Sequence, residues 1–265
     1  ETEPAVSEAP SVDDSTPYGQ HGALHVENGK LTGADGNIVQ LYGMSTHGIA
    51  WFPQYINYDS FRTLRDDWNT NCIRLAMYTA EYGGYCAGGD KEQLKQLVRD
   101  GVSYATELGM YVIVDWHILS DCDPNQNKDE AIAFFREMSE AFVDNDNVLY
   151  EICNEPNSGT SWDSIKSYAE EVIPVIREQK PDAVILVGTP TWSQEIYKAA
   201  ASPLDDANVM YTLHFYAGTH KDDLRNRLET CVQNRLPVFV SEFGMCDASG
   251  NGANDFDSTT KWLDL

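Results

Sequence analysis

Residues 148–156 read VLYEICNEP, an apolar run interrupted once by Glu151 and closed by an amide, a carboxylate and a proline. A parallel strand that helices cover on both faces has this near-continuous apolar character. A second run, PVFVS at residues 237–241, ends in the same way at Glu242. Functional side chains collect where such strands deliver the chain to loops. Two carboxylates at the ends of two buried strands, Glu155 and Glu242, therefore predict a hydrolase.

Short β-branched runs alternate with segments of helical periodicity, which predicts βα units and a parallel sheet. The sequence contains no GxGxxG fingerprint and no P-loop, so an α/β fold of the (β/α)8 TIM barrel type is favoured over a doubly wound sheet. Asp90 and Gly109 are expected to bound the second helix. The sequence ends before an eighth strand. We expect strands at residues 38–44, 72–77, 111–116, 148–153, 183–188, 209–215 and 237–242, and helices at 59–69, 91–108, 128–144, 162–179, 193–200 and 221–235.

The chain carries 42 acidic and 18 basic residues, a formal net charge of -24. Nucleic acids and anionic membranes need basic partners, so neither is expected to bind, whereas neutral sugars remain compatible. The sequence contains no run of 18 apolar residues, so it predicts no membrane-spanning helix. Residues 1–18 are rich in Glu, Ser, Pro and Asp and are interpreted as a disordered linker or N-terminal tail of a secreted, extracellular protein. Residues 19–265 are then the hydrolase domain, incomplete at its C-terminal end.

The six cysteines show no CxxC spacing and fit no zinc motif. Cys86 and Cys122 follow neighbouring expected strands, and they could form one disulfide or remain free thiols. His47, His117 and His214 end the first, third and sixth expected strands. Such side chains can bind sugar hydroxyls, ligate a metal or belong to the core. Because HxH and HExxH spacings are absent, we expect no metal, and the chemistry below needs no cofactor.

Glycoside hydrolysis needs one carboxyl group that protonates the leaving oxygen and one carboxylate that attacks the sugar or activates water. Glu155 and Glu242 can divide these roles. Strand alternation lets Arg74 and Glu242 both point into the barrel, where the guanidinium would lower the pKa of Glu242 by roughly 1–3 units. Glu155, if it faces Glu242 rather than Arg74, would stay protonated and act as the acid. Glu151, four residues earlier and away from the mouth, is interpreted as a structural ion-pair partner.

Three tryptophans, Trp51, Trp116 and Trp192, fall at or just after the ends of expected strands. An exposed indole offers an apolar plate to the C–H face of a pyranose ring, although core packing explains a single tryptophan equally well. Together with Tyr78 and Tyr216, these side chains predict an aromatic-lined cleft.

Asn154-Glu155-Pro156 after strand four and Glu242-Phe243-Gly244 after strand seven resemble the signatures of glycoside hydrolase family five, in the clan of retaining (β/α)8 glycosidases. The similarity to the bacterial endo-β-1,4-glucanase (cellulase) branch of that family runs in order from about residue 20 to the end. The other segments that carry it are GMSTHG at 43–48, IRLAMY at 73–78, VDWH at 114–117, GTPTW at 188–192 and HFYAGTH at 214–220.

The resemblance implies Glu155 as the acid/base, Glu242 as the nucleophile and Arg74 as a hydrogen-bond partner of the nucleophile. It implies that Asn154 binds the 2-hydroxyl of the sugar at the cleaved bond. The remaining implied contacts are His117, His214 and Tyr216 with that same sugar, His47 and Trp51 on the non-reducing side of the cleft, and Trp192 on the leaving-group side.

The first hypothesis is a retaining endo-β-1,4-glucanase that acts on cellulose or related β-glucans through a covalent glycosyl-enzyme intermediate. The alternatives are a β-mannanase or another activity of the same family, an inactive glucan-binding barrel remnant, and a metal-dependent hydrolase. The resemblance also implies a tryptophan closing strand eight beneath the reacting sugar, and no residue here fills that role. We expect the natural protein to continue beyond Leu265 with such a strand, or another chain to supply it; additional modules are compatible.

Overall fold

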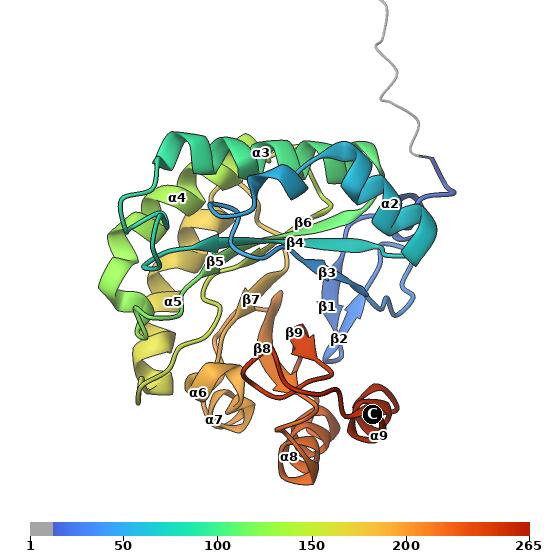
Figure 1. Ribbon diagram of the computed structural model, residues 1–265, viewed down its shortest axis with the longest axis vertical. Helices are drawn as coiled ribbons and strands as arrows, with labels where there is room; N and C mark the ends of the chain where they lie inside the picture. The colour runs from blue at the N-terminus through green and yellow to red at the C-terminus, as the bar shows by residue number, and fades with distance from the viewer. Residues whose placement is uncertain (1–12) are drawn as a thin grey trace, which may run out of the picture.

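The computed structural model describes residues 13–265 and is organised around a seven-stranded parallel sheet (Figure 1). The strand order is β3-β4-β5-β6-β7-β8-β9, so each strand pairs with the next along the chain. Strands in sequence order, alternating with helices and curving into a nearly closed barrel, form the expected (β/α)8 type of fold. The strands are β3 (Gly43–Ser45), β4 (Cys72–Tyr78), β5 (Tyr111–His117), β6 (Val148–Glu151), β7 (Ile185–Val187), β8 (Val209–Tyr216) and β9 (Val238–Gly244).

Helices cover the outer face of the sheet, and local sequence sets where they begin and end. Asp90 accepts a hydrogen bond from Gln93 N at 3.1 Å and caps α3 (Lys91–Glu107), while Gly109 just beyond has a φ of +64°. These are common start and stop devices of helices, so the expected bounds of this helix are confirmed. The other helices are α1 (Pro17–His21), α2 (Tyr58–Trp68), α4 (Lys128–Ala141), α5 (Trp162–Arg177), α6 (Pro190–Ser193), α7 (Ile196–Ala201), α8 (Asp222–Gln233) and α9 (Phe256–Leu263), with short 3-10 turns at Pro53–Tyr55 and Pro124–Asn127.

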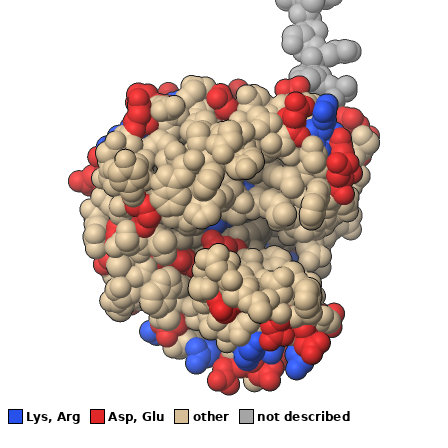
Figure 2. All heavy atoms as spheres, in the orientation of Figure 1, with Lys and Arg blue, Asp and Glu red and all other residues tan. Residues whose placement is uncertain are grey.

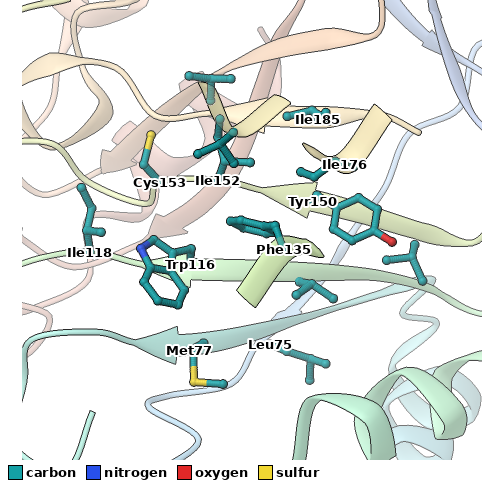
Figure 3. Close-up of a cluster of buried hydrophobic side chains, with 14 of the residues drawn as sticks. Leu75, Met77, Trp116, Ile118, Phe135, Tyr150, Ile152, Cys153, Ile176 and Ile185 are labelled. Carbon is teal, nitrogen blue, oxygen red and sulfur yellow. The ribbon is translucent and has the colours of Figure 1, made fainter. Parts of the chain in front are cut away.

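The main core lies between the sheet and its helices (Figure 3). Trp116 on β5 packs against Phe134 and Phe135 on α4, with ring centroids 5.2 and 6.3 Å away, and all three side chains are fully buried. Trp116 was a candidate for sugar stacking, and that expectation is wrong. Because side chains alternate along a strand, Trp116 points outward to the helices while its neighbours Asp115 and His117 point inward.

Two elements near the N-terminus were not expected. A short hairpin, β1 (His25–Glu27) with β2 (Lys30–Thr32), turns at Asn28 and Gly29, whose φ angles are +53° and +77°. Asn-Gly is a favoured two-residue hairpin turn, so the signal was present in the sequence. Helix α1 lies across the expected boundary at residue 18, and residues 1–12 of the expected tail lie outside the described residues. Of the first strand expected at 38–44, the sheet includes only its last two residues.

All six cysteines are free thiols, and the Sγ of Cys122 contacts Ser120 O at 3.2 Å. The disulfide between Cys86 and Cys122, one of the two alternatives, is therefore not formed. None of the helices in residues 13–265 combines the length and the apolar character needed to cross a membrane.

The sheet keeps two free edges. Within residues 13–265 no strand pairs with the outer edge of β3 or of β9, so strand eight is missing as expected. Most β9 side chains are only half-buried, whereas those of β5 to β7 are buried throughout. Figure 2 shows the molecule hollowed between the part that carries α2 and the part that carries α8 and α9. A cavity of about 750 Å³ lies beside β3, lined by Met44, Phe52, Tyr55, Phe61, Leu64 and Ile73 among others.

Candidate active site

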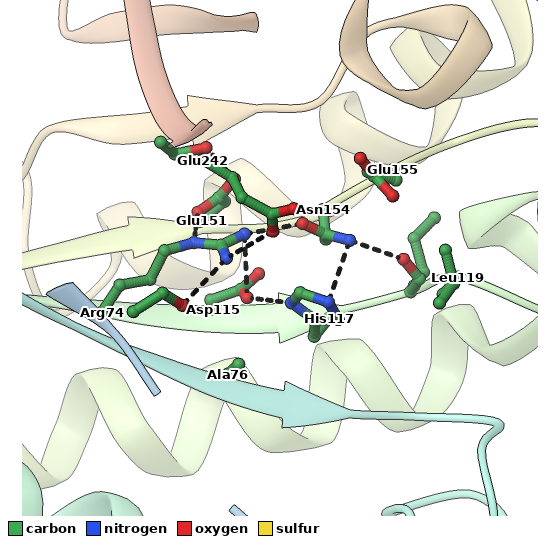
Figure 4. A network of polar contacts seen from close by, with 12 residues as sticks. Arg74, Ala76, Asp115, His117, Leu119, Glu151, Asn154, Glu155 and Glu242 are labelled. Carbon is green, nitrogen blue, oxygen red and sulfur yellow. Dashed lines mark hydrogen bonds and ion pairs between the residues drawn. The ribbon is translucent and has the colours of Figure 1, made fainter. Parts of the chain in front are cut away.

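Polar side chains from β4, β5, β6, β8 and β9 meet inside the barrel, and Arg74 lies at their centre (Figure 4). Its side chain is 3% exposed. Nη1 lies 3.2 Å from Glu242 Oε2, Nε lies 2.7 Å from Glu151 Oε2, and Nη2 lies 3.0 Å from Asp115 Oδ2. Nη2 also donates to Asn154 Oδ1 at 2.6 Å. A buried charge needs such partners, and one guanidinium here serves three carboxylates.

Glu242 is held as an anion. Both oxygens accept hydrogen bonds, Oε1 from the Tyr216 hydroxyl at 2.6 Å and Oε2 from Arg74. Burial alone would raise the pKa of Glu242, but the positive charges of His214 and Arg74 and the bond from Tyr216 outweigh it and lower the pKa to about 2. A carboxylate that stays ionised at all ordinary pH values is suited to nucleophilic attack.

Glu155 has a different environment, because its partner is a histidine rather than an arginine. His214 Nδ1 lies 2.9 Å from Glu155 Oε1, and His214 Nε2 lies 2.9 Å from the hydroxyl of Ser241. Burial opposes protonation of His214, but the bond with Glu155 and the charge of Glu242 outweigh it and raise the pKa of His214. One oxygen each of Glu155 and Glu242 and one nitrogen of His214 all lie within 4.8 Å of one another.

The same three side chains form the one group in residues 13–265 whose spacing would suit a metal ion. The atoms that would ligate a metal already make hydrogen bonds within the protein, however. His214 Nδ1 is hydrogen-bonded to Glu155, and both oxygens of Glu242 accept hydrogen bonds from protein groups. The geometry therefore favours acid–base chemistry over metal binding.

His117 and Asn154 form a second chain of contacts beside Arg74. His117 Nδ1 lies 2.6 Å from Asp115 Oδ2, and His117 Nε2 lies 3.2 Å from Asn154 Nδ2, which also donates to Ile118 O at 3.1 Å. Because an ionised Asp115 only accepts, Nδ1 carries the proton of His117 and Nε2 accepts from the amide. This arrangement fixes the orientation of the Asn154 amide.

Three expected cleft residues cluster on the β4 side. His47 and Tyr78 stack with ring centroids 5.9 Å apart, Trp51 lies 4.9 Å from Tyr78, and Tyr78 lies 4.0 Å from His117. Trp51 is 37% exposed, and its Nε1 donates to Tyr82 O at 2.6 Å. The cluster joins a partly exposed indole to the polar centre and offers apolar ring faces of the kind that pyranose rings stack on.

Trp192 comes from a separate and strained turn. Thr191, Trp192 and Ser193 have φ angles of +60°, +54° and +55°. These lie in the left-handed backbone region that residues other than glycine rarely adopt. Two hydrogen bonds link the turn to the segment after β6, from Trp192 N to Pro156 O at 3.0 Å and from Ser193 Oγ to Asn154 O at 2.7 Å. The turn thus ties a 43% exposed indole to the segment that carries Glu155.

The structure brings ten of the eleven residues predicted from the sequence into one contact network, and Trp192 joins it through its main chain. Sequence reasoning missed Asp115 and Ser241, and it gave Glu151 no role beyond ion pairing. A carboxylate within an apolar run indicates a buried partner, which was the available signal for Asp115 and Glu151. No sequence signal marked the Ser241 hydroxyl as a link between Glu151 and His214.

Comparison with known proteins places these features in a family context. The family model described as Cellulase (glycosyl hydrolase family 5) matches residues 32–265. Endoglucanase A of Butyrivibrio fibrisolvens is 50% identical over 247 residues, which are 92% of this chain and 57% of that protein. An endoglucanase of Clostridium saccharobutylicum is 48% identical over 247 residues, 92% of this chain and 54% of that protein. The chain spans about half the length of the curated relatives it matches.

Solved structures resemble the chain closely. A cellulase aligns with a TM-score of 0.93 at 44% identity, covering 95% of this chain and 80% of that one. The catalytic domain of a Thermobifida fusca endoglucanase variant in complex with cellotetraose aligns with a TM-score of 0.89 at 44% identity, covering 94% and 82% of the two chains.

Proposed function

Since the chain belongs to glycosyl hydrolase family 5, we propose that it is a retaining endo-β-1,4-glucanase that cleaves internal bonds of cellulose or related β-glucans. The pair of carboxylates, Glu155 and Glu242, is the observation that carries the proposal, because an oxygen of each lies within 4.8 Å of the other. Retaining enzymes keep their carboxyl groups about 5–5.5 Å apart, whereas inverting enzymes keep them roughly 6.5–9.5 Å apart to admit a water molecule.

In the first step, Glu242 attacks the anomeric carbon while Glu155 gives its proton to the leaving oxygen. The bond from that carbon to the leaving sugar breaks, and an ester to Glu242 forms. In the second step, Glu155 takes a proton from water, the water oxygen attacks the same carbon, and Glu242 leaves as a carboxylate. The anion-stabilising contacts of Tyr216 and Arg74 support the role of Glu242.

Sugar binding is assigned to the groups around this pair. Asn154, whose amide is fixed by Arg74 and His117, is suited to hold the 2-hydroxyl at the cleaved bond. Trp51 with its stacked neighbours is assigned to the non-reducing side and Trp192 to the leaving-group side. Exposed indoles at two separate places, Trp51 on the β4 side and Trp192 beside the segment that carries Glu155, suit a polymer that binds along a cleft and is cut internally.

The substrate and the location of the protein belong to the same proposal. β-Glucan is supported as the substrate by the names of the relatives, which are endoglucanases, and by the cellotetraose bound to the Thermobifida fusca variant. A polymer of this kind is met outside the cell, so we place the protein there, in line with its acidic N-terminal sequence. Additional modules and a polypeptide segment that fills the open edge are proposed partners.

A second candidate is a glucan-binding barrel that hydrolyses poorly, which the open sheet edge at β3 and β9 within residues 13–265 favours. The two functions are separated by following cellopentaose with proton NMR. The proposed enzyme releases the β-anomer first. Release of the α-anomer first would contradict the retaining mechanism, and binding without new reducing ends would favour the second candidate. Equal rates on mannan and soluble cellulose derivatives would contradict the glucan preference.

A further inference from the structure

We propose that Glu151 is a positioning residue for the acid step. Through Ser241 it keeps a proton on His214 Nε2, so that His214 Nδ1, which contacts Glu155, can share the proton of Glu155. The four side chains form one hydrogen-bonded path that runs from the buried centre to the acid/base. The kinetic consequence rests on the proposed function, but the protonation pattern can be tested without it.

Glu151 is fully buried and acts only as an acceptor. Its Oε2 accepts from Arg74 Nε at 2.7 Å, and its Oε1 accepts from the Ser241 hydroxyl at 2.7 Å. Burial raises the pKa of the Glu151 carboxyl above its ordinary value, while the charge and hydrogen bond of Arg74 oppose that shift. Both oxygens accept from protein donors and one is paired with a buried guanidinium, so Glu151 is a carboxylate near neutral pH. Glu151 Oε1 lies 3.9 Å from His214 Nε2, too far for a hydrogen bond, so Ser241 is the link between them.

The single proton of the Ser241 hydroxyl determines the state of His214. Because that proton is donated to Glu151, the oxygen of Ser241 can only accept from His214 Nε2, 2.9 Å away. Nε2 is therefore protonated. Nδ1 can then accept the proton of Glu155, or hold it as part of an imidazolium, across the 2.9 Å contact. In both states the pair contains one proton that can be transferred to a leaving group.

Substituting Glu151→Gln should reverse the direction of this path. Arg74 Nε–H would hold the amide oxygen, which turns the NH2 group toward Ser241. The Ser241 hydroxyl would then accept from the amide and donate to His214 Nε2. Nδ1 would carry the only proton of a neutral imidazole and donate it to an ionised Glu155. A neutral imidazole does not release that last proton near neutral pH, so the leaving group would receive none.

The kinetic test compares cellotetraose, which needs a proton on its leaving oxygen, with dinitrophenyl cellobioside, which does not. General acid catalysis contributes about 10²–10⁴-fold, so Glu151→Gln should lower kcat/KM for cellotetraose by about 100-fold or more and for the aryl substrate by less than about 10-fold. Ser241→Ala, which only breaks the path, should show the same split with a smaller loss. Equal losses on both substrates in either variant would overturn the proposal.

Glu137→Gln is the matched control. Glu137 on α4 also accepts from two basic side chains, Lys95 at 2.6 Å and Arg99, but it lies outside the path. This variant should keep both rates.

The direct test is the nitrogen chemical shifts of the His214 ring in the wild-type protein. Protonated Nε2 with hydrogen-bonded Nδ1 is expected, and a neutral ring protonated at Nδ1 would overturn the proposal even if no variant folds. In Glu151→Gln the proton should move to Nδ1. If the wild type hydrolyses neither substrate, the proposed function fails, while these shifts still decide the protonation pattern.

Discussion

Removal of the Tyr216 hydroxyl should expose how strongly the protein holds Glu242 as an anion. That hydroxyl donates to Glu242 Oε1 at 2.6 Å, and the substitution Tyr216→Phe deletes the donor while keeping the ring. Hydrogen bonds to charged groups contribute about 1.5–3 kcal/mol. Since one pKa unit corresponds to about 1.36 kcal/mol, the pKa of Glu242 should rise by about 1–2 units.

The sign follows from the state that the bond stabilises. The pKa of Glu242 is lowered from an ordinary value of 4.5 to about 2. The wild-type nucleophile is therefore ionised above about pH 2, and its negative charge is lost only as the pH falls through that value. Without the hydroxyl, protonation should begin at higher pH, and the acid limb of the activity profile should move upward by about 1–2 units.

The assay is kcat/KM for dinitrophenyl cellobioside as a function of pH, because this leaving group makes little demand on Glu155. Tyr111→Phe is a suitable control, since Tyr111 begins β5 at the opposite end of the barrel and donates to Gly22 O at 2.7 Å. An acid limb that stays in place in a folded Tyr216→Phe protein would refute the reasoning.

Three further outcomes are expected. Glu155→Ala should impair cellotetraose far more than the aryl cellobioside and be rescued by azide, whereas Glu242→Ala should abolish turnover of both; equal losses without rescue would undo these roles. Arg74→Met should lower the free energy of unfolding by about 3–5 kcal/mol, because it leaves buried carboxylates without their partner, and an unchanged urea midpoint would contradict this. Appending a designed β-strand and helix to the chain, so that the strand pairs with β3 and β9, should raise the melting temperature and the hydrolysis rate, and no change in either would show that the free edges of β3 and β9 are harmless.

The sequence predicts the strands of the seven-stranded sheet better than it predicts the N-terminal elements of the chain, helix α1 and the hairpin of β1 and β2. Runs such as 148–153 are apolar because helices cover both faces of a parallel strand, and burial dominates their composition. Residues 38–44 are less constrained, since β3 has a free edge and its side chains are exposed. The hairpin at Asn28 and Gly29 was missed although its turn signal is strong.

The residues of the site could be predicted because the ends of the strands could be predicted from the sequence. Residues at the carboxyl ends of neighbouring parallel strands must meet, which is enough to collect Arg74, Glu155 and Glu242. Contacts deeper in the barrel depend on which residues of neighbouring strands lie opposite each other. The hydrophobic pattern of the sequence does not specify this pairing register. Asp115 lies directly opposite Glu151 in the paired strands, so two like charges face one guanidinium. Only the folded sheet reveals that crowding.

The two unpaired edges should make the behaviour of the protein in solution depend on salt. Free strand edges offer backbone donors and acceptors to other copies, but a formal net charge of -24 keeps copies apart while their repulsion is unscreened. The screening length falls from about 10 Å at 0.1 M salt to about 3 Å at 1 M. Moderate salt should therefore remove the barrier to edge-to-edge association without altering the fold, and the protein should be best stored and crystallised from dilute buffers.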